Sequence, residues 1–350
     1  MKISRHCHCL RALVPVSLWL IGVIFISALF LADSAGKGEV EKRTYFFKEA
    51  DKEIDYRLYV PSEYSKDKKF PLVVLLHGLG SNPQQVIRYE GIIQEAEKRN
   101  YIVVAPYGYN ERGWYGARGK GKQGTIEALL LGENDKDPEN IGELSERDVM
   151  NVLEIVRKEF SVDDGRVYLM GHSMGGGGTI YLGEKYSSIW AGLAPLAPAA
   201  MPPAVSFDSS ILKKMTKIPI YLVAGERDRL IPVFFVREWA QEMKRLKMDY
   251  IYEEIKEGDH SRSFTNNPKM MARIYDFFDE RRKGRSNSKV SSWRVFTNRS
   301  GVKIKASVDS VSGEKVTIVR DDNRKFTIPI SSLIDEDEEY LREWLTINDN

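Results

Sequence analysis

One short stretch of the sequence constrains the fold more than any other. The apolar run at 166–170 leads into Gly-His-Ser-Met-Gly at 171–175, and further glycines at 176–178 precede Thr179. A strand, a glycine-flanked turn and a helix predict a sharp turn that presents Ser173, as in a nucleophile elbow. Such a turn needs strained backbone at the serine. Adjacent backbone must also approach closely, which favours glycine at the flanking positions. A phosphate-binding loop is the alternative, but the glycine run lacks a lysine.

The helix predicted after Ser173 should direct its N-terminus toward the reacting centre. Its unpaired N–H groups and partial positive charge could then stabilise an oxyanion. The backbone amide of Met174 is the first such donor.

A serine hydroxyl needs a base to take its proton, and the chain has five histidines. Two of them precede residue 10 and lie ahead of a hydrophobic segment. His172 neighbours the serine, so the tight turn should direct its ring elsewhere. His77 ends the predicted strand at 72–76 and begins a His-Gly-Leu-Gly sequence. Elimination leaves His260, after the predicted strand at 250–255, as the base.

The base needs a carboxylate to fix its tautomer and stabilise its charged form. Asp228 lies in the loop after the buried run at 218–224, where such a group is expected. Glu226, closer to the strand, and Asp259, beside His260, are the alternatives. The chain order serine, aspartate, histidine is that of an α/β-hydrolase.

The motifs together resemble the α/β-hydrolase superfamily, in its esterase branch of polyhydroxybutyrate depolymerase-like, feruloyl esterase-like and carboxylesterase enzymes. The resemblance spans about residues 43–283 and rests on the sequences at 77–80, 146–149, 166–168, 171–176, 225–228 and 258–260. It implies a serine hydrolase that cleaves carboxylic esters through an acyl-enzyme. Ser173 is then the nucleophile, His260 the base and Asp228 the orienting acid. The amides of Leu79 and Met174 form the implied oxyanion hole.

Strand and helix patterns alternate along the same region, which predicts an α/β fold with a mostly parallel sheet and helices on both faces. The expected strands are 44–48, 54–60, 72–77, 101–105, 166–171, 190–196, 219–224 and 249–255. The expected helices are 84–99, 146–160, 174–186, 232–247 and 268–282. Ser145 and Asp148 are expected to cap the second of these helices.

The connection between residues 107 and 142 is long and has no sustained periodicity. Loops of this length beside an active site are often functional. Tyr107 and Trp114, together with His77 and His172, are therefore candidate substrate contacts. A solvated surface loop whose rings cover the sheet end is the alternative.

An apolar segment at 12–32 follows Lys2, Arg5 and Arg11. This order predicts export with the N-terminus kept inside. The length fits either a long signal peptide or a spanning anchor, so residues 1–35 are interpreted as one or the other. The protein is expected to be periplasmic or extracytoplasmic, either secreted or anchored in the membrane.

Composition narrows the function further. The 52 basic and 50 acidic residues give a net charge of +2, which argues against nucleic-acid binding. Both cysteines lie before residue 10, so no disulfide framework or thiolate metal site is possible in the rest of the chain. No cofactor and no metal are expected, and the partner is a small or polymeric ester.

A second unit is predicted at 292–347, after a charged linker at 284–291. Short strands separated by turn residues indicate a small β-barrel. The unit resembles the SH3-like homology domain of an endocytic adaptor family. Binding of a protein or glycan partner and a purely stabilising role are both open.

Two other functions stay open for the chain. One is a serine peptidase of the prolyl-oligopeptidase type, but its large N-terminal propeller is not expected, because only about ten residues separate the apolar segment from the first expected strand. The other is a binding protein that uses a hydrolase scaffold without catalysis.

Overall fold

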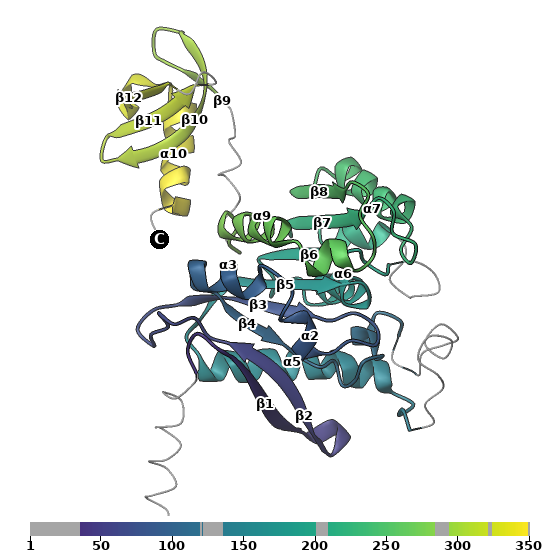
Figure 1. Ribbon diagram of the computed structural model, residues 1–350. Coiled ribbons are helices and arrows are strands. Elements are labelled where there is room, and N and C mark those ends of the chain that lie inside the picture. Colours follow the sequence, from purple (N-terminus) through teal and green to yellow (C-terminus); the bar gives the residue numbers. More distant parts are fainter. Residues whose placement is uncertain are drawn as a thin grey trace, which may run out of the picture.

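The computed structural model describes residues 36–119, 121, 136–200, 209–283, 294–320 and 324–348. Its larger unit is built on an eight-stranded sheet with the order β1-β2-β4-β3-β5-β6-β7-β8 (Figure 1). The strands are β1 (Val40–Phe47), β2 (Lys52–Tyr59), β3 (Phe70–Leu76), β4 (Ile102–Ala105), β5 (Val162–His172), β6 (Gly192–Leu196), β7 (Ile220–Gly225) and β8 (Tyr250–Ile255). The β1–β2 and β2–β4 pairs are antiparallel and the others are parallel, which confirms the predicted α/β sheet.

Helices cover both faces of this sheet. The helices are α2 (Pro83–Val86), α3 (Ile92–Arg99), α5 (Ile141–Glu159), α6 (Met174–Lys185), α7 (Val233–Arg245), α8 (Arg262–Thr265) and α9 (Pro268–Asp279), with 3-10 turns η2 (Lys48–Ala50), η3 (Trp114–Gly116) and η4 (Ser209–Lys214). Successive strand residues point to opposite faces. In β3, Leu72 and Val74 therefore belong to the core on the side of α5, α6 and α7, whereas Val73 and Leu75 belong to the core on the side of α3, α8 and α9.

The segment from residue 83 to 99 departs from the prediction. The sequence pattern predicts one helix there, but the structure has α2 and α3 with a break between them. Helix α2 ends at Val86, and Gly91, the residue before α3, has φ +94°, a conformation that glycine adopts without steric cost.

The expected caps of the following helix are wrong. Helix α5 begins at Ile141, so Ser145 and Asp148 lie inside it. The Ser145 hydroxyl accepts from the Tyr115 amide at 2.9 Å, and Asp148 accepts from the Tyr109 amide at 3.1 Å. The local sequence rule assigns both side chains to a cap, whereas the fold uses them to hold the preceding loop.

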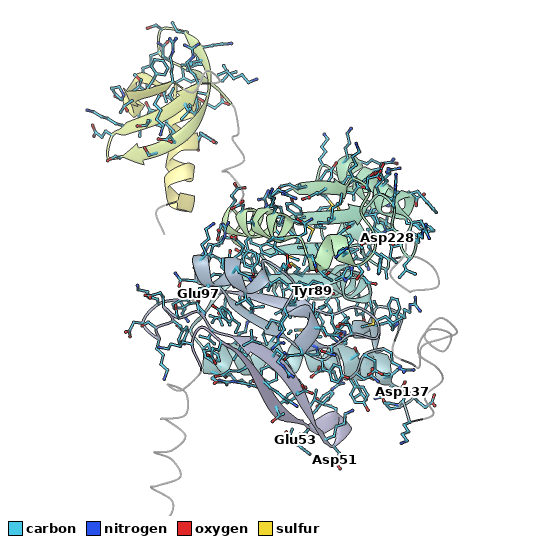
Figure 2. The ribbon with its side chains drawn as sticks, viewed as in Figure 1. Asp51, Glu53, Tyr89, Glu97, Asp137 and Asp228 are labelled. Atoms are coloured by element: carbon cyan, nitrogen blue, oxygen red, sulfur yellow. The ribbon has the colours of Figure 1, made fainter. Side chains whose placement is uncertain are left out.

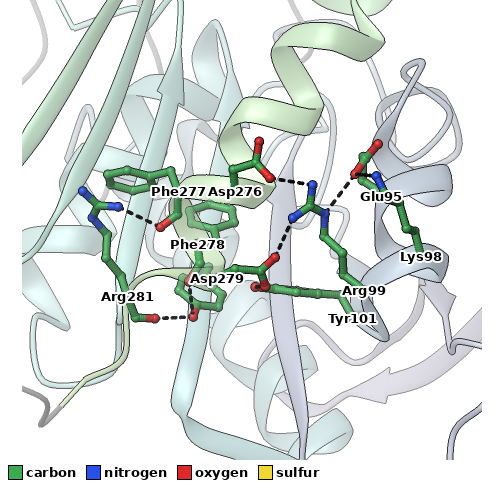
Figure 3. A network of polar contacts seen from close by, with 10 residues as sticks. Glu95, Lys98, Arg99, Tyr101, Asp276, Phe277, Phe278, Asp279 and Arg281 are labelled. Carbon is green, nitrogen blue, oxygen red and sulfur yellow. Dashed lines mark hydrogen bonds and ion pairs between the residues drawn. The ribbon is translucent and has the colours of Figure 1, made fainter. Parts of the chain in front are cut away.

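A polar network joins α3 to α9 (Figure 3). Arg99 donates to Asp276 at 2.7 Å, to Asp279 at 2.6 Å and to Glu95 at 2.9 Å. Tyr101 also donates to Asp279, at 2.8 Å. The network holds α9 beside α3. It thereby also anchors the end of the β8–α9 connection that leads into α9.

The second unit is an antiparallel sheet with the order β12-β11-β10-β9. Its elements are β9 (Arg294–Thr297), β10 (Lys303–Ser312), β11 (Lys315–Arg320), β12 (Lys325–Pro329), the turn η5 (Ile330–Ser332) and helix α10 (Asp335–Asn348). Phe296, Val316, Ile318 and Leu341 form its core. The small sheet expected at this end of the chain is present, whereas its closure as an SH3-like barrel and the boundaries of both units stay predictions.

The predicted signal segment at 12–32 lies outside the described residues. Within the part of the chain that is described, no helix combines the length and hydropathy that crossing a membrane requires.

Candidate active site

Ser173 lies at the turn between β5 and α6. Its backbone has φ 58° and ψ −115°, a strained conformation for a residue with a side chain. A Cβ at Gly171 would come within 2.3 Å of the Gly175 carbonyl oxygen, and one at Gly175 within 2.3 Å of the Leu76 carbonyl oxygen. The two glycines are therefore required for steric reasons, as the spacing of the motif predicts.

The hydroxyl of Ser173 faces the imidazole of His260. The distance from Oγ to Nε2 is 2.8 Å, and Nδ1 lies 2.7 Å from Oδ2 of Asp228. The other carboxylate oxygen of Asp228 accepts from the amides of Leu230 and Ile231, both at 2.8 Å. Asp228 lies beyond the end of β7, and its side chain is buried (Figure 2).

This arrangement fixes the proton on one side of the His260 ring. A carboxylate only accepts hydrogen bonds, so Nδ1 must carry the proton. The lone pair of Nε2 is then directed at the Ser173 hydroxyl, which is the state that a general base requires.

The two alternative carboxylates have other partners. Glu226 accepts from the Glu257 amide at 2.8 Å. Asp259 accepts from the amides of Ser261 and Ser263 at 3.0 and 3.1 Å. Of the three acidic candidates, Asp228 is the one that contacts the imidazole.

Two backbone N–H groups lie near Ser173. Met174 is the first residue of α6, and Leu79 follows Gly78, where an added Cβ would lie 3.5 Å from the Ser173 Cβ. Within the described residues, neither amide takes part in a backbone hydrogen bond. Both are therefore available to an oxygen atom bound beside Ser173.

A cavity of about 580 Å³ opens over Ser173 and His260. Apolar side chains line much of it, namely Leu79, Trp114, Ala199, Leu230 and Ile231. Ser81, Gln85 and Tyr89 add polar groups at intervals of four residues. The volume is that of a site for a small organic molecule.

The four candidate substrate contacts divide into two pairs. Trp114 and His172 line the cavity, and the guanidinium of Arg118 lies 3.4 Å from the Trp114 ring centroid. His77 and Tyr107 are not among the lining residues. The ring of His77 is buried, with Nδ1 2.8 Å from the Gly78 carbonyl and Nε2 2.8 Å from the Tyr107 carbonyl. Burial lowers the pKa of His77.

Tyr89 is a site residue that the sequence did not reveal. It lines the cavity, and its hydroxyl lies 3.1 Å from Nδ1 of His172. Burial raises the pKa of Tyr89 to about 12. No local pattern marked it: Tyr89 lies after α2 and outside any helix, and its partner His172 is 83 residues away.

In the part of the chain that is described, no three histidine, cysteine, aspartate or glutamate side chains are grouped so that they could hold a metal ion. Besides Ser173 and His260, the polar side chains that line the cavity are Ser81, Gln85, Tyr89, Arg118, His172, Ser261 and Thr265.

Comparison with known proteins identifies the family of the chain. The sequence matches the Esterase family over residues 48–267, more than half of the chain. It is 28% identical over 180 residues to a bifunctional acetylxylan esterase/xylanase of Neocallimastix patriciarum, a match that covers 51% of this chain and 22% of that relative. The chain thus spans about a fifth of that protein.

Solved structures share the fold at low sequence identity. A ferulic acid esterase from Anaeromyces mucronatus has a TM-score of 0.51 and 19% identity, covering 69% of this chain and 90% of that one. An S-formylglutathione hydrolase from Staphylococcus aureus has a TM-score of 0.52 and 17% identity, covering 69% and 96%. The chain belongs to the Esterase family and has an α/β-hydrolase fold.

Proposed function

We propose that the chain hydrolyses esters through an acyl-enzyme on Ser173, with His260 as general base and Asp228 as its orienting acid. The observation that carries this proposal is the continuous line of contacts, 2.7 Å from Asp228 to His260 and 2.8 Å from His260 to Ser173. A nucleophile, a base and an orienting group in hydrogen-bond contact are the recognised signature of nucleophilic catalysis.

In the first half-reaction Ser173 Oγ attacks the ester carbonyl carbon while its proton passes to His260 Nε2. The carbonyl oxygen becomes an oxyanion, which accepts hydrogen bonds from the amides of Leu79 and Met174. The imidazolium then gives its proton to the alkoxy oxygen of the substrate as the bond to the carbonyl carbon breaks. An alcohol leaves and the acyl group remains on Ser173.

In the second half-reaction water takes the place of the alcohol. His260 removes one proton from the water as its oxygen attacks the acyl carbon. The same proton returns to Ser173 Oγ as the acyl–oxygen bond breaks. A carboxylic acid leaves and the starting state is restored, while Asp228 stabilises the imidazolium in both steps.

The cavity supports a substrate that is apolar on one side and carries oxygen atoms on the other. Leu230 and Ile231 suit a hydrocarbon or aromatic surface, whereas Ser81 and Gln85 suit hydroxyl or carbonyl groups. The similar proteins include an acetylxylan esterase and a ferulic acid esterase. We extend the proposal to small or polymeric esters, handled outside the cytoplasm as the segment at 12–32 predicts.

The test is labelling by a fluorophosphonate together with turnover of p-nitrophenyl esters. Ser173→Ala should abolish labelling, and Ser173→Ala or His260→Ala should lower kcat by about 10⁴- to 10⁶-fold. Ser188→Ala, the same change at an exposed serine, is the matched control. Labelling that persists in Ser173→Ala contradicts the assigned nucleophile.

The peptidase alternative is tested with the same enzyme. Aminoacyl p-nitroanilides are compared with p-nitrophenyl acyl esters at equal concentration. The proposal expects faster turnover of the esters, because an amide leaving group needs stronger protonation. Faster turnover of the amides would reverse the order.

A further inference from the structure

The ring of His172 lies buried between the nucleophile and the loop that carries the base. Its Nε2 is 2.8 Å from the backbone carbonyl oxygen of His260, and its Nδ1 is 3.1 Å from the hydroxyl of Tyr89. The ring stacks on Phe264 of α8 at 5.0 Å between centroids and lies 5.1 Å from the His260 ring. His172 thus contacts the main chain of His260 and the ring of Phe264, four residues later.

The partners of His172 determine where its proton is. A backbone carbonyl only accepts, so Nε2 must carry the hydrogen. Nδ1 then has a lone pair, and the Tyr89 hydroxyl must donate to it. Tyr89 therefore donates to Nδ1 of His172, and Nε2 of His172 donates to the carbonyl of His260.

We propose that His172, with Tyr89 donating to its Nδ1, is a positioning residue that holds the main chain of the general base in its reactive place. This inference rests on the proposed function of Ser173 and His260. The base lies in a turn between β8 and α8, where no strand or helix fixes its backbone. The bond from His172 is made at residue 260 itself, so it acts where a displacement would matter most.

Other ties of this loop lie further from the imidazole. The Arg227 amide donates to the Gly258 carbonyl at 2.8 Å, and the Glu90 amide donates to the Thr265 carbonyl at 2.8 Å. These bonds hold the two ends of the loop. At its centre Asp259 accepts from the amides of Ser261 and Ser263 within the loop, and His172 donates to the His260 carbonyl from another element. Because Glu90 follows Tyr89 directly, its bond to Thr265 also ties the segment that carries Tyr89 to the end of the loop.

His172 suits this role because it stays uncharged. Burial, and after it the neighbouring His260, lower the pKa of His172 to about 3. When His260 becomes an imidazolium during the reaction, the neutral ring beside it keeps its donor on the carbonyl. A positively charged side chain at the same place would repel that intermediate.

The first test compares two substitutions at His172. His172→Phe keeps the stack on Phe264 but removes the N–H, and we expect kcat to fall by about 10²-fold, the effect of a displacement near 1 Å in a reacting group. His172→Gln offers an amide N–H toward the same carbonyl, and we expect it to recover most of the loss. Equal kcat in His172→Phe and the parent protein would overturn the proposal, as would equal losses in both variants.

A double-mutant cycle separates positioning from general destabilisation. Tyr89→Phe removes the donor to Nδ1 of His172 and should lower kcat by several-fold on its own. In the His172→Phe background it should have no further effect on kcat, because its route to the base is already gone. Tyr252→Phe, which removes a hydroxyl bonded to Glu254 away from the site, is the matched control. Additive losses in the cycle would contradict the inference.

A measurement that needs no activity separates this inference from the proposed function. In ¹⁵N-histidine-labelled protein, the ¹⁵N shifts of His172 should report protonated Nε2 and unprotonated Nδ1 at neutral pH, and Tyr89→Phe should move the Nδ1 signal because that nitrogen loses its donor. A protonated Nδ1 overturns the inference even in an active enzyme. Absent fluorophosphonate labelling of the parent protein would instead contradict the proposed function.

Discussion

Tyr115 donates its phenol hydrogen to the backbone carbonyl of His77 at 3.0 Å. The ring is buried, and a Cβ at Gly108 would come within 2.4 Å of it and one at Gly178 within 2.6 Å. The Tyr115 amide in turn donates to Ser145 on α5. Through its main chain and its side chain, Tyr115 thus joins the loop at 107–119 to helix α5 and to the segment that carries the Leu79 amide.

Removal of this hydroxyl should affect both stability and rate. In Tyr115→Phe the buried carbonyl of His77 loses its partner, and we expect the free energy of unfolding to fall by about 1–3 kcal/mol. A shift of the Leu79 amide should also lower kcat with little change in KM, because that amide acts on the oxyanion. Urea unfolding and ester kinetics measure the two effects. Tyr252→Phe should leave both unchanged, and an unaltered kcat in Tyr115→Phe would separate this loop from the oxyanion hole.

Trp114 should contribute to substrate binding. Its ring is buried at 3% exposure, lines the cavity and lies under the guanidinium of Arg118. In Trp114→Ala this wall is lost, and we expect KM to rise for esters with a bulky acyl or alcohol group. The KM for p-nitrophenyl acetate, which is too small to reach across the cavity, should change less. An unchanged KM for every ester would remove Trp114 from the binding surface.

Asp148 should make the stability of the protein depend on pH. Burial is the main cause that raises the pKa of Asp148 from 3.8 to about 6. Between these values the unfolded chain loses the proton while the folded chain keeps it, so stability falls as the pH rises. The full effect is about 3 kcal/mol, present below pH 4 and lost by about pH 6.

Comparison with Asp148→Asn isolates this effect. The amide does not titrate. The unfolding free energy of the parent protein should therefore rise relative to that of the variant as the pH falls from 7 to 4. Urea unfolding at several pH values gives the difference directly. Other groups, such as His172, titrate equally in both proteins and cancel. A difference that stays constant with pH contradicts burial of an ionisable group at this position.

Local patterns and long-range contacts were not equally visible in the sequence. The strand, turn and helix around Ser173 follow from apolar periodicity and from the sterics of Gly171 and Gly175, which act within a few residues. The pairing of Ser145 with the Tyr115 amide joins residues 30 apart and leaves no local pattern. The same side chain therefore looked like a helix cap. Tyr89 was missed for the same reason, since its partner His172 lies 83 residues away.

Substitutions at Asp228 and at its neighbour Glu226 test which carboxylate orients His260. Asp228→Asn keeps the size of the side chain but can present an N–H to Nδ1 of His260, which favours the wrong tautomer. We expect kcat to fall by about 10⁴-fold. Glu226→Gln makes the same chemical change two residues earlier, at a side chain that contacts the Glu257 amide and not the imidazole, and should leave kcat near that of the parent. The rates of ester turnover and of fluorophosphonate labelling measure both variants. A large loss in Glu226→Gln with a small one in Asp228→Asn would transfer the orienting role to Glu226, because the imidazole can be fixed by whichever carboxylate it reaches during turnover.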